Sequence, residues 1–566
     1  MNRSFTQICE AQHMTRSRNG AELLVQCLEM QGVKYIFGIP GAKVDAIFDV
    51  LADHGPRLIL CRHEQNAAFM AGMYGLLSGT PGVCLVTSGP GVTNLVTGLS
   101  TATYDGYPLV ALGGNVRRGM RHIKTHQSLN NVSVMKAVTK DSVEIYDGDS
   151  IPESIVNAFR QSAEPPLGAT FISLPQDVLL GPVEAVPIPP VPPPAHGVAG
   201  AHVIREVAQR IDSAKLPVIF AGMFASRPDV TKALRDLLRR YPLPVVNTYE
   251  AAGVVSRDLF NCYAGSLGLF RNQPGDRLLQ QADVVVTIGF DPAEYDPEVW
   301  NKGRTGTLID IAEHRSVIDR YFQPSLELMG DLAANLNALA GQLVSPTHDP
   351  TANPLVLQVQ DALLMAKVEG GREDGFPIHP LRLIYELRSL IGDDVTVLCD
   401  IGSIYIWMAR YFQAFEPYRL MFSDGQQTLG VALPWAIATC LARPGEKVVS
   451  MSGDGGFLFS AMELETAVRE KCDFVHLVWC DGSYNMVKIQ QELKYHRPFG
   501  VDFGPVDIVK YAEAFGAVGL RIRSSDEIGP VLRQALHTRG PVLVEIPIDY
   551  SHNHELCAIV SENATI

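Results

Sequence analysis

Two acidic residues follow two apolar segments of the chain, and their types and spacing are suited to binding a divalent cation. Asp454 stands between two glycines after the apolar segment 448–452, and Asp481 directly follows the next apolar segment, 474–480. Mg²⁺ prefers carboxylate oxygens and commonly binds phosphate oxygens as well. A strand that ends in glycines and leads into a helix also directs backbone N–H groups toward a phosphate. The pair therefore predicts a site for Mg²⁺ and a phosphate-bearing molecule, and the alternative for Asp454 is a helix N-cap after a tight turn.

A third acidic residue, Glu64, begins a helical pattern in the first part of the chain. In the stretch LILCRHEQNAAFMAGMYG, a strand is expected to end at Cys61 and a helix to open at Glu64. Taken by itself, a glutamate in the first turn of a helix interacts favourably with the helix dipole. Further along, the motif Gly89-Pro90-Gly91 ends another apolar segment. It either brings the backbone close to a ligand or forms a structural turn before a helix.

The elements that must position these residues are predicted to be parallel strands flanked by helices. Short β-branched runs, apolar on both faces and ended by Gly or Pro, alternate with longer helical patterns, as is typical of central strands. The runs are YIFGIP, GVCLVTSGPG, PLVALGG, ATFISLP, LPVIFAG, ADVVVTIG, VTVLCDIG, EKVVSMSGDGG, DFVHLVWCDG and PVLVEIPID. The alternation predicts an α/β protein with doubly wound parallel-sheet domains. Ligands bind at the carboxyl ends of strands in such sheets, so Asp454 and Asp481 are expected at one shared edge.

Two breaks divide the chain into three predicted domains. The stretch VPIPPVPPPA, residues 186–195, is rich in proline and cannot continue a helix or a central strand. The stretch SPTHDPTANP, residues 345–354, is polar and contains proline, and a helical segment rich in Leu, Met and Ala follows it. The predicted domains are residues 16–185, 196–345 and 376–555.

The composition limits the class of protein. The chain has 566 residues and a net charge of −14, which argues against a nucleic-acid partner because such proteins normally show a basic face. Its ten cysteines include no CxxC pair and no metal-ligand spacing, which favours reduced thiols. We see no signal-peptide pattern and no apolar run long enough to cross a membrane. The expectation is a soluble cytoplasmic protein without a membrane partner.

The spacing of the two aspartates resembles a known signature. The metal-diphosphate motif of thiamine-diphosphate enzymes is GDG followed, some two dozen residues on, by two asparagines. Here Asp481 and Gly482 stand in place of those asparagines. The resemblance implies that Asp454, Asp481 and the backbone carbonyl of Ser483 bind Mg²⁺.

The resemblance extends over about residues 16 to 550, and it is to the acetolactate synthases, specifically their catabolic, FAD-independent branch. The segments that carry it are FGIPGAKVD, RHEQNAAFMA, THQSLNNVSV, FISLPQDV, AAGVVSRDLF, NQPGDRLLQQADVVVTIGFDPAEYDPEVWN, SDGQQTLGVALPWAI and MELETAVR. It implies a pyrimidine-binding, a central and a diphosphate-binding domain. The implied reaction is the condensation of two pyruvates to 2-acetolactate with loss of CO₂, on the route to acetoin. The implied assembly is a homodimer or homotetramer with active sites at the dimer interface.

The same resemblance assigns roles to individual residues. Glu64 would be the acid beside the cofactor's pyrimidine ring, and Lys43 and Gln127 would lie near the reacting acids. Alternatives are a solvated loop cation for Lys43 and an ordinary loop amide for Gln127. The implied cofactor-binding residues are Gly89, Pro90, Gly402, Ser403, Gly425, Gln427, Leu429, Asp454, Gly455, Gly456, Tyr484 and Met486.

Several positions in this set depart from the family pattern or have a second explanation. Leu429, where the family usually has Met, would be the apolar wedge that bends the cofactor. Met486, Val487 and Gln490 would face the substrate, although an apolar core face explains Met486 as well.

The cofactors implied are thiamine diphosphate and Mg²⁺, without FAD. The chain has LFRNQPGDRLL where flavin-binding relatives carry an RFDDR-type segment, with Arg271 in place of an Asn common in the flavin-free branch. The run 291–301 would fill the region where flavin would bind. The alternatives are a pyruvate oxidase or decarboxylase of the same superfamily, or a non-catalytic regulatory paralogue. The separated His122 and His126 count against a decarboxylase, which commonly uses an adjacent His pair.

Overall fold

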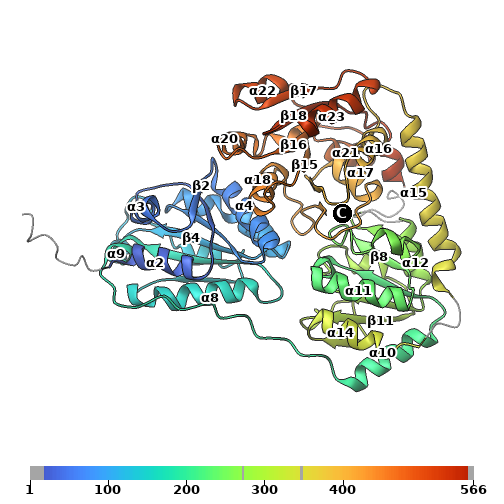
Figure 1. Ribbon diagram of the computed structural model, residues 1–566, viewed down its shortest axis with the longest axis horizontal. Helices are drawn as coiled ribbons and strands as arrows, with labels where there is room; N and C mark the ends of the chain where they lie inside the picture. The colour runs from blue at the N-terminus through green and yellow to red at the C-terminus, as the bar shows by residue number, and fades with distance from the viewer. Residues whose placement is uncertain (1–17, 270–272, 345–348, 559–566) are drawn as a thin grey trace, which may run out of the picture. The chain divides into compact units, whose positions relative to one another are not determined.

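The computed structural model describes residues 18–269, 273–344 and 349–558. Two compact units make up the chain, Met1–Pro193 and Pro194–Ile566. The first unit carries one sheet and the second carries two, and each of the three sheets has six strands (Figure 1). The Pro-rich stretch 186–195 forms neither helix nor strand, as predicted.

The first unit is built on one parallel sheet with the strand order β2-β1-β3-β4-β6-β5. Its strands are β1 (Tyr35–Gly38), β2 (Arg57–Leu60), β3 (Gly82–Val86), β4 (Leu109–Asn115), β5 (Asp141–Glu144) and β6 (Ala169–Pro175). Its helices are α2 (Gly20–Met30), α3 (Asp45–Asp53), α4 (Glu64–Ser78), α5 (Pro90–Asn94), α6 (Val96–Tyr104), α7 (Asn131–Met135), α8 (Ile151–Ala163) and α9 (Gln176–Leu180).

The core of this unit lies on both faces of the sheet. Every residue of β3, β4 and β6 is buried, which is why these strands read as continuous apolar runs. Helix α4 is also buried, over ten consecutive residues from Asn66 to Gly75, so the helix that begins at Glu64 is fixed rigidly beside the sheet. Helix α2 starts with a capping box between Asn19 and Glu22.

The central sheet belongs to the second unit and has the strand order β12-β11-β10-β7-β8-β9, all parallel. Its strands are β7 (Pro217–Ala221), β8 (Val245–Thr248), β9 (Tyr263–Leu267), β10 (Val284–Ile288), β11 (Thr307–Ala312) and β12 (Leu326–Met329). Its helices are α10 (Ala201–Ser213), α11 (Pro228–Arg240), α12 (Pro274–Gln281), α13 (Pro297–Trp300) and α14 (Leu332–Ala340), with short 3₁₀ turns η4 (Met223–Ser226) and η5 (Arg257–Cys262).

The last sheet, in the same unit, has the order β14-β13-β15-β16-β18-β17 and is also parallel. Its strands are β13 (Thr396–Cys399), β14 (Leu420–Met421), β15 (Val448–Gly453), β16 (Phe474–Cys480), β17 (Val518–Arg521) and β18 (Val542–Pro547). The helices around it are α16 (Pro380–Leu390), α17 (Ser403–Tyr411), α18 (Ala432–Ala442), α19 (Asp454–Phe457), α20 (Leu464–Arg469), α21 (Asn485–Tyr495), α22 (Ile508–Ala514), α23 (Ile528–His537) and α24 (Asn553–Ala558). The long helix α15 (Pro354–Arg372) runs along one side of this unit (Figure 1) and is the helical segment predicted after residue 354.

The first and last sheets share one topology. Numbered within each sheet, their strand order is 2-1-3-4-6-5, whereas the central sheet has the order 3-2-1-4-5-6. In each sheet the strand order reverses beside the first strand, so that later strands are added on its other side. A ligand crevice is expected at such a topological switch point. The three doubly wound α/β domains predicted from sequence are confirmed, and all ten predicted runs contain strands. The exact domain boundaries stay predictions.

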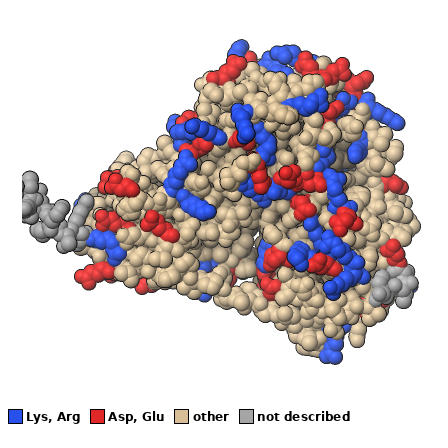
Figure 2. Space-filling view, viewed as in Figure 1, with Lys and Arg blue, Asp and Glu red and all other residues tan. Residues whose placement is uncertain are grey.

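The surface and the helix lengths bear on possible partners. Within the described ranges, no helix is both long and apolar enough to cross a membrane. On the face shown in Figure 2, Lys and Arg side chains are interspersed with Asp and Glu side chains instead of gathering into one basic patch. The eight cysteines whose side chains the structure describes are free thiols.

Candidate active site

Three loops at the carboxyl edge of the last sheet bring together most of the predicted diphosphate and metal residues. They follow the neighbouring strands β13, β15 and β16, and they lead into helices α17, α19 and α21. None of these helices has a side-chain hydrogen bond at its N-cap. In α19 the N–H of Gly455 is bound by the carboxylate of Asp454, whereas the first N–H groups of α17 are left for other acceptors. Gly402, which precedes α17, has a φ of 136° that L side chains rarely adopt. Unfilled space lies where its Cβ would be, as expected where a ligand approaches the backbone closely.

Asp454 and Asp481 lie at the ends of adjacent strands, as the spacing predicted. Strands β15 and β16 pair in register up to Gly453 and Trp479. Asp454 accepts hydrogen bonds from the N–H of Gly455 (3.0 Å) and, across the strand gap, from the N–H of Gly482 (2.9 Å). Gly453 is the N-cap residue of α19, so the alternative that Asp454 is a simple N-cap is wrong.

Asp481 is held by two neighbours that leave part of its carboxylate available. Its Oδ2 accepts from the hydroxyl of Ser483 (2.6 Å) and from the amide of Asn485 (2.9 Å). Asn485 also accepts from the hydroxyl of Ser403 (2.9 Å), which joins the loop before α17 to the loop after β16. The sequence analysis assigned no role to Asn485, although it stands only four residues after Asp481.

The electrostatics of this pair favour a bound cation. The pKa of Asp454 is raised to about 6, chiefly by burial and also by the nearby Asp481, against the hydrogen bonds from backbone N–H groups. Burial also raises the pKa of Asp481 above its usual range. Two partly buried carboxylates at one edge are costly as anions without a positive partner, and a divalent cation between them removes that cost.

Close packing explains the two glycines that follow Asp454. A Cβ added at Gly455 would lie 2.7 Å from the ring of Tyr484, and one added at Gly456 would lie 2.9 Å from Oδ2 of Asp400. Tyr484 therefore covers Gly455 and packs edge-on against Phe503, with ring centroids 5.1 Å apart. These contacts favour glycine at positions 455 and 456, whereas a Cβ at Gly453 would meet nothing within 4 Å.

Asp400 was not predicted from sequence, and it holds the end of the loop 425–430, which carries the predicted cofactor residues Gly425, Gln427 and Leu429. It is buried, and both its oxygens accept from the N–H of Gly430, at 2.9 and 3.0 Å. Burial raises the pKa of Asp400 to about 7. The available signal was its position in LCDIGS, an aspartate at a strand end much like Asp454.

The loop itself carries Gly425, Gln427 and Leu429. Gln427 is exposed and has a φ of 48°, a left-handed conformation that is uncommon for a residue other than glycine. Leu429 is half-buried against the core of the last sheet. The N–H of Asp424, just before this loop, donates to Glu250 (2.7 Å), a residue that follows strand β8 of the central sheet. The central sheet therefore helps to position the loop.

Helix α21 carries the residues predicted to face the substrate. Met486 and Gln490 are half-buried, while Val487 is exposed. Met486 also packs against the core of the last sheet, so the core-face alternative for this residue describes part of its surroundings.

A second group of predicted residues lies at the carboxyl edge of the first unit's sheet. Glu64 is half-buried in the first turn of α4, as predicted, and its Oε2 accepts from the side chain of Asn94 (2.9 Å). A Cβ added at Gly91 would lie 3.6 Å from Oε1 of Glu64. Helix α5 starts at Pro90, so the Gly-Pro-Gly motif does form a turn before a helix, as the structural alternative proposed. Asn94, missed from sequence, fixes one oxygen of Glu64 and leaves the other for chemistry.

Gln127 contacts the same motif from another loop. Its Oε1 accepts from the hydroxyl of Ser88 (3.1 Å), and its Cβ and Cγ would lie 3.1 Å from a Cβ at Gly89. Both Gly89 (φ 61°) and Gln127 (φ 58°) have left-handed backbones. A strained conformation for a glutamine is typical of a functional segment.

Lys43 lies after strand β1 at this edge. The side chain is half-buried, and its ammonium group has no hydrogen-bond or ion-pair partner in the part of the chain that the structure describes. The hydroxyl of Thr87, at the same edge, is buried without a hydrogen-bond partner. Unpaired polar groups here indicate a ligand that would complete their bonding.

The residues present fit thiamine diphosphate and Mg²⁺. The last sheet offers two carboxylates for a cation and uncapped helix N-termini for a diphosphate, and the first unit offers a carboxylate beside a glycine turn. The described ranges contain no cluster of three or more His, Cys, Asp and Glu side chains placed to hold a metal. The predicted site needs only two carboxylates and a carbonyl. Arg271 lies outside the described residues.

Comparison with known proteins covers nearly the whole chain. Three thiamine pyrophosphate enzyme families match it: the N-terminal TPP binding domain at residues 18–134, the central domain at 204–339 and the C-terminal TPP binding domain at 400–546. The chain is 51% identical to an acetolactate synthase of Bacillus subtilis over 98% of this chain and 97% of that protein. It is 45% identical to a catabolic acetolactate synthase of Raoultella terrigena, over 96% of this chain and 97% of that protein. It is 29% identical to the large subunit of acetolactate synthase isozyme 2 of Escherichia coli, over 94% of this chain and 96% of that protein. The chain thus belongs to the thiamine pyrophosphate enzyme family and, within it, to the acetolactate synthases.

Proposed function

We propose that the protein condenses two molecules of pyruvate to 2-acetolactate with release of CO₂, using thiamine diphosphate and Mg²⁺. The observation that carries the proposal is the pair Asp454 and Asp481 at the ends of β15 and β16, beside the uncapped N-terminus of α17. It occurs in a chain that is 51% identical to an acetolactate synthase along nearly its whole length. The route to acetoin and a cytoplasmic location are part of the same proposal, since the catabolic relative is similarly close.

The residues of the last sheet would hold the cofactor. Asp454, Asp481 and the carbonyl of Ser483 would bind Mg²⁺, and the first N–H groups of α17, after Gly402 and including Ser403, would bind the diphosphate. Gly425, Gln427 and Leu429 would contact the aminopyrimidine, with Leu429 as the apolar support. When bound, thiamine diphosphate supplies the carbanion chemistry, and the protein positions it.

Glu64 would hold and move the proton that this chemistry requires. Asn94 occupies its Oε2, so Oε1 is the atom available to the pyrimidine ring. Gly89 and Pro90 would bring the backbone close to that ring.

Lys43 and Gln127 would act on the substrate. An unpaired ammonium is suited to a pyruvate carboxylate as a point charge. Gln127, fixed by Ser88, would orient the second keto acid through its amide N–H₂.

The proposal includes no flavin, because a glutamate already fills the crevice of the central sheet. In the order β12-β11-β10-β7-β8-β9, the expected ligand crevice lies between β10 and β7. Glu294 is buried there and accepts from the N–H of Met223 after β7 (3.0 Å to each oxygen) and from the hydroxyl of Thr248 after β8 (2.5 Å). The N–H that would bind a dinucleotide phosphate is therefore already paired. An absorption spectrum of the purified protein without flavin bands supports this part, and stoichiometric FAD contradicts it.

The assembly proposed is a homodimer or homotetramer in which two chains complete each active site. Glu64 belongs to the first compact unit and Asp454 to the second. An isologous pairing of two chains would build two identical sites from these halves. No nucleic-acid or membrane partner is proposed.

The experiment is a product assay. The purified protein is incubated with pyruvate, thiamine diphosphate and Mg²⁺, the product is decarboxylated with acid, and acetoin is measured by its colour reaction. Acetoin that depends on the acid step and on both cofactors is expected. Acetaldehyde as the main product would indicate a decarboxylase, hydrogen peroxide an oxidase, and no consumption of pyruvate a non-catalytic paralogue.

A further inference from the structure

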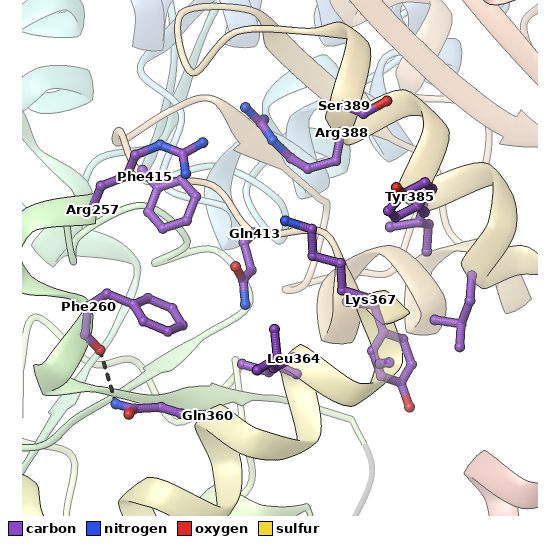
Figure 3. A pocket seen from close by; sticks show the side chains of 15 residues that line it. Arg257, Phe260, Gln360, Leu364, Lys367, Tyr385, Arg388, Ser389, Gln413 and Phe415 are labelled. Carbon is purple, nitrogen blue, oxygen red and sulfur yellow. Dashed lines mark hydrogen bonds between the residues drawn. The ribbon is translucent and has the colours of Figure 1, made fainter. Parts of the chain in front are cut away.

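A cavity of about 380 Å³ lies in the second unit, and it contains none of the residues assigned above to the active site. Its walls are η5 of the central sheet, helices α15 and α16, and residues 411–415, which begin at the last residue of α17 (Figure 3). The volume is in the range of sites for small organic molecules, which commonly lie between domains. Four segments that are distant in sequence therefore enclose a space large enough for a ligand.

The cavity has an excess of positive charge. Arg257 donates to Asp393 from Nε (2.5 Å) and Nη2 (2.8 Å), and Arg388 donates to the same carboxylate from Nη2 (2.6 Å). Lys367 adds a third cation from helix α15. Among the described residues, Asp393 pairs with Arg257 and Arg388 and Lys367 pairs with no carboxylate, so the three cations exceed their paired anions by two charges. The cations also affect one another. The pKa of Arg388 is lowered mainly by burial, and the nearby positive charge of Arg257 lowers it as well.

Several hydrogen-bond donors in the cavity are unused. A guanidinium has five N–H groups, and the bonds of Arg388 to Asp393 and to the carbonyl of Ile391 both come from Nη2. Those of Arg257 come from Nε and Nη2. The side chains of Lys367 and Gln413 have no partner among the residues that the structure describes. Figure 3 shows Lys367 and Gln413 extending from two segments into the space between the labelled side chains, with Arg388 extending across that space above them.

The remaining wall is apolar and aromatic. Phe260, Leu364, Ile384 and Phe415 line it, and Leu364 is 59% exposed although it is a large apolar side chain. Arg257 lies over the ring of Phe415, 4.0 Å from its centroid, which fixes both side chains. A flat apolar body placed here would cover surface that is otherwise in contact with water.

We propose that this cavity binds a small organic phosphate monoester whose apolar body is flat. The dianionic phosphate matches the two unpaired positive charges, and it accepts from Arg257, Arg388, Lys367 and Gln413. Arginine forks are suited to phosphate oxygens, and lysine adds a point charge. The apolar body lies against Phe260 and Leu364. The proposal is independent of the proposed function.

The test uses phenyl phosphate as the probe and isothermal titration calorimetry on the full-length protein. Saturating thiamine diphosphate and Mg²⁺ are present, so that the diphosphate site is not available to the probe. Saturable binding is expected, and Lys367→Gln should weaken it about tenfold or more, because it removes one charge-assisted hydrogen bond. Lys367 is exposed and unpaired, so this variant should fold normally.

Three controls make the result decisive. Lys232→Gln removes a lysine of helix α11, 78% exposed and paired with Asp236, and it should leave binding unchanged. Benzyl alcohol, which keeps the ring without the charge, should not bind, and inorganic phosphate should bind at least about tenfold more weakly. The proposal is overturned if phenyl phosphate shows no saturable binding, if Lys367→Gln binds as tightly as the wild type, or if either control compound binds as tightly as phenyl phosphate. None of these outcomes depends on turnover of pyruvate.

Discussion

At the residue scale, Asp454 has a structural and a proposed chemical task. Its carboxylate joins the loop after β15 to the loop after β16 through the N–H of Gly482. The same carboxylate, beside Asp481, has a raised pKa that a cation would lower again. The proposal that these two residues bind Mg²⁺ thus rests on their geometry and on the cost of two anions at one edge.

Replacing Asp454 by Ala should abolish the retention of Mg²⁺ and thiamine diphosphate. Loss of a metal ligand should weaken binding by at least about 100-fold, since even outer partners of a metal site are worth 10- to 100-fold. The measurement is the cofactor stoichiometry of the purified protein, with a circular-dichroism spectrum as the check on folding. Asp454→Asn, which keeps one acceptor for a backbone N–H, is the second variant. Cofactor bound at the wild-type stoichiometry in both variants would show that the metal assignment is wrong.

Replacing Glu64 by Gln should separate binding from chemistry. Glutamine keeps an oxygen for the amide of Asn94 but cannot release a proton, so the cofactor should still bind. Turnover should fall by about 10²- to 10⁴-fold, the usual contribution of a general acid or base. The exposed Glu29→Gln on helix α2 is the matched control and should be silent. If Glu64→Gln protein turns over pyruvate at nearly the wild-type rate, another group provides the acid.

At the element scale, β15 and β16 each lead directly into one of the two aspartates, and a buried histidine of β16 links the two strands. His476 in β16 lies between the hydroxyls of Ser450 (2.8 Å to Nδ1) and Ser452 (2.9 Å to Nε2) of β15. Its ring also packs against Phe457, with centroids 5.5 Å apart. Burial lowers the pKa of His476 to about 3 from 6.5, so the ring is neutral in the folded protein at ordinary pH.

This histidine should make the protein less stable in acid. Between pH 6.5 and about 3 the unfolded chain binds a proton at His476 that the folded protein does not. The free energy of unfolding therefore falls as the pH is lowered through this window, by about 1.4 kcal/mol per pH unit at most. His476→Gln removes this contribution, so its melting temperature should depend less on pH between 6.5 and 5 than that of the wild type. Equal pH dependence of the two proteins would mean that His476 does not carry this effect.

The element scale also shows which strands a sequence can reveal. The ten predicted runs are strands with apolar residues on both faces. The strands that were not predicted include the edge strands β5, β9, β12, β14 and β17, which are short or partly exposed and lack that pattern. β11 is central but is interrupted by the buried Asp310, which accepts from the hydroxyl of Thr287 (2.7 Å). A polar residue whose hydrogen-bond partner is supplied only by the folded structure interrupts the apolar run, and the strand is then not recognised from the sequence.

At the scale of the whole molecule, sequence predicted the three sheets and the motif residues but not their supports. Asp454, Asp481 and Glu64 stand out because each follows an apolar run. Asn94, Asp400 and Glu250 do not, because their partners are fixed by tertiary structure. Glu250, for example, holds the N–H of Asp424, which lies 174 residues away in the chain. Such pairs have no local spacing that a single sequence could show.

The shared topology of the first and last sheets gives the molecule two comparable edges. One carries Glu64 and the glycine turn, and the other carries the aspartates and the uncapped helix α17. The two edges belong to different compact units. The central claim is that one catalytic site needs both, and that two chains supply them.

Subunit complementation tests this claim most directly. Glu64→Gln chains and Asp454→Ala chains, each inactive alone, are mixed in equal amounts and allowed to exchange subunits, and 2-acetolactate formation is measured. Half of the resulting dimers should be mixed, and one of the two sites in each mixed dimer contains both wild-type residues. The account predicts recovery of about a quarter of the wild-type activity. If mixed dimers are shown to form, for instance by mass spectrometry, and remain inactive, then Glu64 and Asp454 do not meet across an interface between two chains.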